Sequence, residues 1–82
     1  MKTVLVLGAG VYYVRAIEEV RAAGYRTVVV DRDPDAPGLA ITDAPHAVDL
    51  ADADAVLAVA RDERVDGVLA LNDFGVRQGA HA

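Results

Sequence analysis

A glycine-containing turn near the N-terminus is the first place in this sequence where a ligand could bind. The turn reads GAGVYY, from Gly8 to Tyr13, and directly follows the apolar run TVLVL. Gly8 permits a tight turn, Gly10 lets the backbone approach a ligand closely, and the free N–H groups that open a helix favour an anion. The dinucleotide-binding fingerprint has a third glycine where this chain has Tyr13. The turn therefore predicts a binding site for a small ligand. Tyr13, in the place of the third glycine, argues against NAD(P) as that ligand.

Asp31 keeps a dinucleotide alternative open. It ends the apolar run TVVV and lies about 20 residues beyond Gly10, which is near the spacing of the acid that holds the ribose of NAD. Two of the three features of that fingerprint thus fit, and Tyr13 does not. A small NAD(P)-binding module, with Asp31 as its cofactor-binding acid, is therefore one alternative function.

Patterns typical of buried strands alternate with patterns typical of helices along the chain. The strands and helices that they predict must position the turn at residues 8–13. We expect strands at residues 3–7, 27–30, 47–50 and 68–71, and helices at residues 11–23 and 53–61. This alternation predicts an α/β fold with a doubly wound parallel sheet, and right-handed crossovers predict the strand order 3-2-1-4. The first and fourth strands are then neighbours. Ligands in such sheets bind at the carboxyl ends of the strands beside this point.

Finer expectations follow from single residues. The three prolines between residues 32 and 45 argue against a helix there, so we expect one face of the sheet to lack a second helix. Gly24 is expected to end the first helix and Asp52 to cap the second. The second helix is predicted to turn three side chains inward: Val56, Leu57 and Ala60.

Composition narrows the possible functions. Thirteen acids against eight bases give a net charge of −5, with no basic cluster for a nucleic acid or an anionic membrane. The chain has no cysteine or serine and only two isolated histidines, so we expect neither a metal site nor a usual covalent nucleophile. Asp33 and Asp35 flank a proline and predict a turn rather than a metal pair. We expect a cytoplasmic protein.

Several short pieces of the sequence together resemble one family. They are Leu7-Gly8-Ala9-Gly10, DRDPDAP at residues 31–37, Val48-Asp49 and NDFGVR at residues 72–77. In this order and spacing they resemble the Rossmann-like, pre-ATP-grasp domain that begins the ATP-grasp carboxylate–amine ligases. That superfamily includes biotin carboxylase, the carbamoyl phosphate synthetase large chain and purine-pathway ligases. The resemblance covers essentially all 82 residues.

The resemblance implies a division of labour. Residues 1–82 would form a single domain on the acceptor-substrate side of a longer ligase, whose later lobes bind ATP and Mg²⁺. This domain would bind no cofactor itself and would be inactive alone. The ligase would activate a carboxylate as an acyl phosphate, which an amine then attacks. By the same resemblance, the substrate site would be lined by Gly8, Gly10, Val11 and Tyr12, with Asn72 and Asp73 facing them.

One departure from the family bears on the substrate. Purine-pathway members often carry an acid or amide directly after the glycines, whereas this chain has Val11-Tyr12-Tyr13. This argues against a ribonucleotide and makes an amino acid or a flatter carboxylate at least as consistent. A further alternative is a non-catalytic scaffold or dimerisation domain. Because the last predicted helix is cut short after Phe74, we expect part of the sheet to be uncovered and the chain to form a homodimer.

Overall fold

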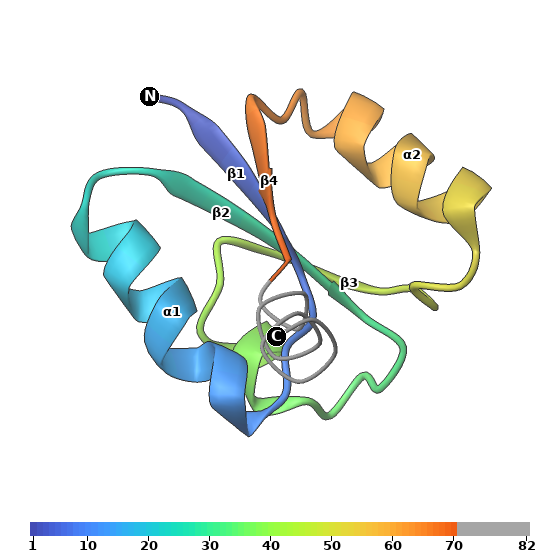
Figure 1. The fold of residues 1–82 in the computed structure, drawn as a ribbon, viewed down its shortest axis with the longest axis horizontal. Coiled ribbons are helices and arrows are strands. Elements are labelled where there is room, and N and C mark those ends of the chain that lie inside the picture. Colours follow the sequence, from blue (N-terminus) through green and yellow to red (C-terminus); the bar gives the residue numbers. More distant parts are fainter. Residues whose placement is uncertain (71–82) are drawn as a thin grey trace, which may run out of the picture.

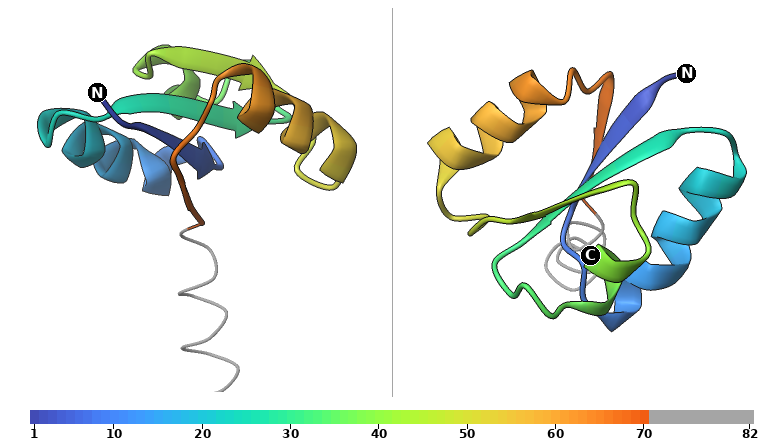
Figure 2. Two further views of the ribbon diagram at one scale, coloured as in Figure 1. Left: turned by 90° about the horizontal axis from the view of Figure 1, so that it is seen from above. Right: turned by 180° about the vertical axis from the view of Figure 1, so that it is seen from behind.

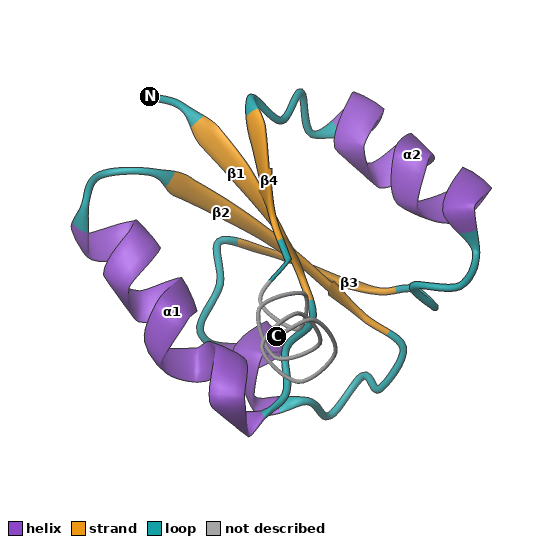
Figure 3. Ribbon diagram, viewed as in Figure 1, coloured by secondary structure: helices purple, strands orange, loops and turns teal. Residues whose placement is uncertain are grey.

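The computed structural model of the chain describes residues 1–70. Its strands and helices follow one another as β1 (Thr3–Leu7), α1 (Val11–Ala22), β2 (Arg26–Asp31), the 3₁₀ turn η1 (Pro37–Ala40), β3 (Ala44–Ala47), α2 (Ala53–Asp62) and β4 (Gly67–Leu69). Figure 1 shows the order in space, and Figure 3 shows how helix and strand alternate.

The four strands form one parallel sheet in the order β3-β2-β1-β4, which confirms the predicted α/β class and strand order. Val6 of β1 pairs with Val29 of β2 on one side and with Leu69 of β4 on the other. The runs TVLVL and RTVVVD occupy the centre because their apolar, mostly β-branched residues can be buried on both faces of a sheet.

The two helices cover opposite faces of the sheet. Val6 and Val29 point towards Ile17 of α1, whereas Leu5 and Val28 point towards Val59 of α2. This division follows from the two-residue period of a strand, which sends neighbouring side chains to opposite sides. The front and back views agree on it: α1 and α2 lie on either side of the strands (Figures 1 and 2).

The third strand was predicted at the wrong place. It runs from Ala44 to Ala47, whereas the prediction began at residue 47. Pro45 argues against a helix but not against this strand, because β3 is at the edge of the described sheet, where a residue without an N–H is tolerated. Val48 already leaves the strand, and its N–H donates to the carbonyl oxygens of Asp31 and His46. The fourth strand likewise begins earlier, at Gly67.

Two details of packing also differ from prediction. Leu57 of α2 is 56% exposed, and Val59 is buried in its place because Val56, Val59 and Ala60 form the stripe that faces the sheet. The proline-rich connection between β2 and β3 forms no α-helix, as predicted, but it still covers part of the α1 face, since η1 places Leu39 in the same core cluster as Ile17. Asp52 caps α2 as predicted: its carboxylate accepts a hydrogen bond from the Ala55 N–H at 3.1 Å.

The described helices are too short and too polar to cross a lipid bilayer. Gly24 follows the last residues of α1 with a φ of +96°, a conformation that glycine adopts readily, which fits its predicted place at the helix end.

Candidate functional site

Gly8 and Tyr13 explain how the glycine turn is built without a third glycine. Gly8 ends β1 in a left-handed conformation, with a φ of +132°. The ring of Tyr13 reaches back over it, so that a Cβ added to Gly8 would lie only 2.8 Å from Tyr13 Cζ. Tyr13 is half-buried and also packs against the core cluster on the α1 face. The ring therefore fills the space next to Gly8 that a closely approaching ligand would need.

Gly10 is in a different position, since no described residue crowds the space next to it. A Cβ at Gly10 would meet its nearest neighbour, Tyr13 Cδ2, only at 4.0 Å. Gly10 is the N-cap of α1, no side chain of residues 1–70 caps this helix, and its first turn holds no acid. Val11 and Tyr12, the first two residues of the helix, are 69% and 91% exposed. The start of α1 is thus accessible, and its N–H groups and helix dipole favour a negatively charged ligand.

Asp31 faces the glycine turn but is occupied by its own chain. One carboxylate oxygen, Oδ2, accepts a hydrogen bond from the Ala9 N–H at 2.9 Å. The other, Oδ1, accepts one from the Asp33 N–H, also at 2.9 Å. These contacts are those of a residue that holds two loops together. They differ from the role of a ribose-binding acid that the dinucleotide alternative requires.

The loop after β2 closes over the glycine turn from the other side. The Gly38 N–H donates to the Ala9 carbonyl oxygen at 2.7 Å. Asp33 and Asp35 form the predicted turn, because the Asp33 carboxylate accepts the Asp35 N–H at 2.9 Å. The sequence singled out Tyr13 as the residue that resists a dinucleotide, but it did not predict that the ring covers Gly8 or that Gly38 holds the turn. The only local signal for Gly38 was its place after Pro37, which indicates a turn and gives no hint of the partner.

The structure brings part of the predicted site together. Gly10, Val11 and Tyr12 follow one another at the carboxyl end of β1, and β1 pairs with β4 as expected. Gly8 lies in the same turn, but the Tyr13 ring covers it, so its predicted place in the lining of the site is not supported. Asn72 and Asp73 lie outside the described residues, so their predicted place opposite the turn remains a prediction.

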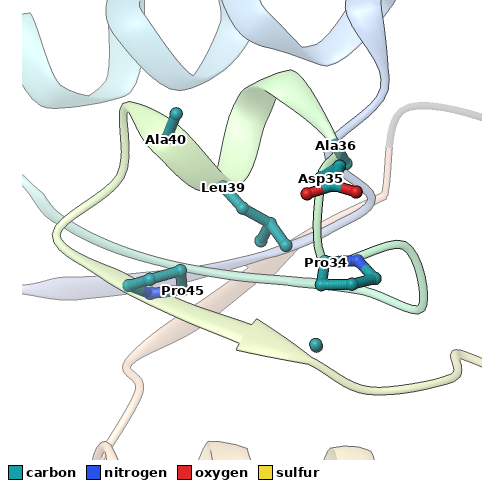
Figure 4. A pocket seen from close by; sticks show the side chains of 7 residues that line it. Pro34, Asp35, Ala36, Leu39, Ala40 and Pro45 are labelled. Carbon is teal, nitrogen blue, oxygen red and sulfur yellow. The ribbon is translucent and has the colours of Figure 1, made fainter.

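A hollow of about 430 Å³ lies beside η1 and β3, away from the predicted site. Its lining is mostly apolar and consists of Pro34, Asp35, Ala36, Leu39, Ala40, Pro45 and Ala47. Figure 4 shows the Leu39 side chain directed towards it between Pro34 and Pro45. Asp35 is the one charged group of the lining. The hollow therefore lacks the converging polar groups that mark a specific small-molecule site.

Two acids away from the turn hold the framework in place. Hydrogen bonds from His46 and Arg26, each 2.8 Å long, lower the pKa of Glu63 and tie the end of α2 to β2 and β3. The N–H of Thr27 lowers the pKa of Asp43, with further help from the Thr27 hydroxyl and Arg21. His46, isolated in the sequence, thus takes part in a hydrogen-bond network with Glu63 and Arg26 that joins α2 to β2 and β3.

Comparison with known proteins finds two curated relatives. The chain is 39% identical over 61 residues to the formate-dependent phosphoribosylglycinamide formyltransferase of Burkholderia lata, and 38% identical over 61 residues to that of Burkholderia vietnamiensis. Each alignment covers 74% of this chain and 15% of the relative, so the chain spans a small part of their length. No protein-family profile matches it. The relatives' name describes an enzyme that depends on formate and transfers a formyl group to phosphoribosylglycinamide.

Proposed function

We propose that this chain is the substrate-side, Rossmann-like domain of an ATP-dependent carboxylate–amine ligase of the ATP-grasp type. The observation that carries the proposal is the 61-residue similarity to formate-dependent phosphoribosylglycinamide formyltransferases. Formate is a carboxylate and phosphoribosylglycinamide offers an amine, which are the two reactant classes of such a ligase. The parallel sheet of order β3-β2-β1-β4 fits the Rossmann-like domain that this role requires.

In the proposed enzyme this domain binds the acceptor and leaves ATP and Mg²⁺ to other lobes. The carboxylate is activated as an acyl phosphate, which the acceptor amine then attacks. The accessible start of α1, at Gly10, Val11 and Tyr12, supports this role because it can take an anionic part of the acceptor. Asn72 and Asp73 are proposed to face it, with the Asp73 carboxylate holding the amine.

The identity of the acceptor is the finer part of the proposal. The apolar and aromatic residues after Gly10 argue for an amino acid or a flat carboxylate, whereas the relatives act on a ribonucleotide. Tyr13 blocks the approach to Gly8 but not to Gly10, and no other residue of the described part of the chain crowds Gly10. A phosphate could therefore lie at the start of α1 without contacting Gly8. We propose phosphoribosylglycinamide as the first acceptor to test and an amino acid as the second.

The decisive variant is Gly10→Val in the full-length ligase. Gly10 has φ −65° and ψ 176°, which valine can adopt, and the nearest neighbour of an added Cβ among residues 1–70, apart from the adjoining residues of the chain, is 4.0 Å away. The fold should persist while the side chain enters the acceptor site. We expect the acceptor KM to rise at least about tenfold, the effect of losing about 1.4 kcal/mol of binding energy.

Gly67→Val is the matched control. It makes the same change at the start of β4, where an added Cβ has no heavy atom within 4 Å, at the opposite end of the strands from the turn. Its acceptor KM should equal that of the unmodified enzyme. An unchanged KM in Gly10→Val would contradict the placement of the acceptor at this turn.

Asp73→Asn tests the other half of the site. An amide cannot make the charge-assisted hydrogen bond that a carboxylate makes to an ammonium group, so an amine-bearing acceptor should bind about 1–3 kcal/mol more weakly. The acceptor KM measures this loss. Equal KM values in the variant and the parent would remove Asp73 from the site.

A further inference from the structure

The segment DRDPDAPG, residues 31–38, has no part in the site proposed so far, yet it is fastened to the glycine turn. The fastening point is Ala9, which lies between Gly8 and Gly10 and is completely buried. The Ala9 N–H donates to Asp31 Oδ2 at 2.9 Å, and the Ala9 carbonyl oxygen accepts from the Gly38 N–H at 2.7 Å. Both main-chain polar groups of Ala9 are thus used by one segment that is distant in sequence.

Asp31 is suited to this task because a carboxylate is an acceptor on both oxygens. It receives the Ala9 N–H on one oxygen and the Asp33 N–H on the other, and so ties the glycine turn to the loop that begins after β2. An asparagine in its place could accept only one of these two N–H groups and would turn an NH₂ donor towards the other. The geometry therefore demands the charged side chain.

Gly38 is required for a steric reason. A Cβ at this position would lie 2.8 Å from Ile17 Cδ1 and 2.9 Å from both Cα and Cβ of Ala9. Real Cβ atoms essentially never come this close to backbone atoms, so any side chain would push η1 away from the turn. The 2.7 Å hydrogen bond to Ala9 depends on the absence of that side chain.

The glycine turn needs such external support. Gly8 and Gly10 flank Ala9, and glycine loses more conformational freedom on ordering than any other residue. Nothing in their own side chains can hold the turn. The ties through Ala9 replace that missing rigidity and fix the direction in which Gly10 leads into α1.

We propose that Asp31 and Gly38 are positioning residues, which hold Ala9 so that Gly10 and the first turn of α1 keep the geometry that binds the acceptor. This inference rests on the proposed function for its ligand, but its structural half can be tested without one. Asp31 then acts through the backbone of Ala9 and does not itself contact the acceptor.

The test compares Asp31→Asn with Asp33→Asn in the 82-residue chain. Asp33 makes the same kind of turn contact, to the Asp35 N–H, but does not touch the glycine turn. Amide hydrogen exchange followed by NMR should show the Ala9 amide exchanging roughly 10- to 100-fold faster in Asp31→Asn, as expected for a buried hydrogen bond lost from a local structure. In Asp33→Asn the Ala9 rate should be unchanged.

The second readout is the binding of phosphoribosylglycinamide, followed through the amide signals of Val11 and Tyr12. We expect a dissociation constant about tenfold higher in Asp31→Asn, and the parent value in Asp33→Asn. An unchanged Ala9 exchange rate in Asp31→Asn would overturn the positioning role itself, and unchanged affinity despite faster exchange would overturn its link to binding. The proposed function itself would be overturned by a different result. In that result the parent chain binds neither phosphoribosylglycinamide nor an amino acid, while Asp31 still protects the Ala9 amide from exchange.

Gly38→Ala extends the test, with Gly67→Ala as its control because an added Cβ at Gly67 meets no atom within 4 Å. If Gly38→Ala or Asp31→Asn fails to fold, amide exchange in the unmodified chain tests the proposal instead. Its Ala9 amide should be far better protected than that of Asp35, whose acceptor lies in an exposed turn. Equal protection of the two amides would overturn the proposal.

Discussion

The two helices of the described chain begin in opposite ways. α2 starts at Asp52, whose carboxylate accepts the Ala55 N–H, and Asp54 adds a second acid to its first turn. α1 starts at Gly10 with no side-chain cap and no acid in its first turn. The positive end of α2 is therefore neutralised by its own residues, as in a helix with a purely structural role. Within residues 1–70 no side chain neutralises the positive end of α1. This is the end at which we propose that the acceptor binds.

The helices also differ in how firmly they are packed. α1 buries Ile17 completely, between the sheet and the 3₁₀ turn that carries Leu39. α2 buries Val59 and leaves Leu57 more than half exposed. The helix that opens on the candidate site is thus also the one fixed in the tighter core. This packing helps to hold the turn, because its two glycines have no side chains that could fix its geometry.

The largest expected effect is a loss of stability when the tightly packed side chain of α1 is shortened. Ile17→Ala should lower the free energy of unfolding by about 2–5 kcal/mol, since it removes a fully buried side chain and leaves a cavity. Leu57→Ala, the corresponding truncation on α2, should change it by less than about 0.5 kcal/mol. Urea denaturation of both variants measures this, and similar losses in the two would contradict the packing described.

A medium effect is expected at the start of α2. Asp52→Ala should cost about 1 kcal/mol of stability, the usual value of an N-cap, while the acceptor KM stays unchanged. Asp52→Asn, which can still cap the helix, should retain nearly all of the stability. A rise in acceptor KM on loss of the Asp52 side chain would mean that both helix starts serve the substrate.

A smaller effect should appear with pH. The folded-state pKa values of Glu63 and Asp43 lie below their ordinary values of 4.5 and 3.8, because both carboxylates accept hydrogen bonds. Their stabilisation is therefore complete above these ordinary values and is lost as the pH falls through the lower, folded-state values. Thermal unfolding should show a midpoint that declines below about pH 4.5, and Glu63→Gln should make this decline shallower. An equally steep decline in the variant would exclude Glu63 as a cause.

The smallest effect is an expected absence of binding. Tyr13 covers Gly8, and Asp31 is engaged by Ala9 and Asp33, so the two features that a dinucleotide needs are occupied. We predict no useful affinity for NAD(H) or NADP(H). Calorimetric titration is the measurement, and a dissociation constant in the low micromolar range would restore the dinucleotide alternative.

The sequence by itself determined the architecture. Continuous apolar runs identify β1 and β2 because strands buried on both faces admit few polar residues, and the alternation with helices leaves one common handedness for the crossovers. The cap at Asp52 and the turn at Asp33 were also predictable. Each of these signals lies within a few residues of the structure it produces.

Only the tertiary structure decided the contacts on which the candidate site depends. Asp31 meets Ala9 across 22 positions of sequence, and Gly38 meets Ala9 and Ile17 after the chain has crossed the sheet. Contacts between distant segments also explain two other features. Pro45 lies in an edge strand, and Val59 rather than Leu57 faces the sheet. A local pattern states which residues are apolar or can turn, but the partner that satisfies a buried N–H or fills the space beside a glycine is supplied by a distant segment once the sheet has formed.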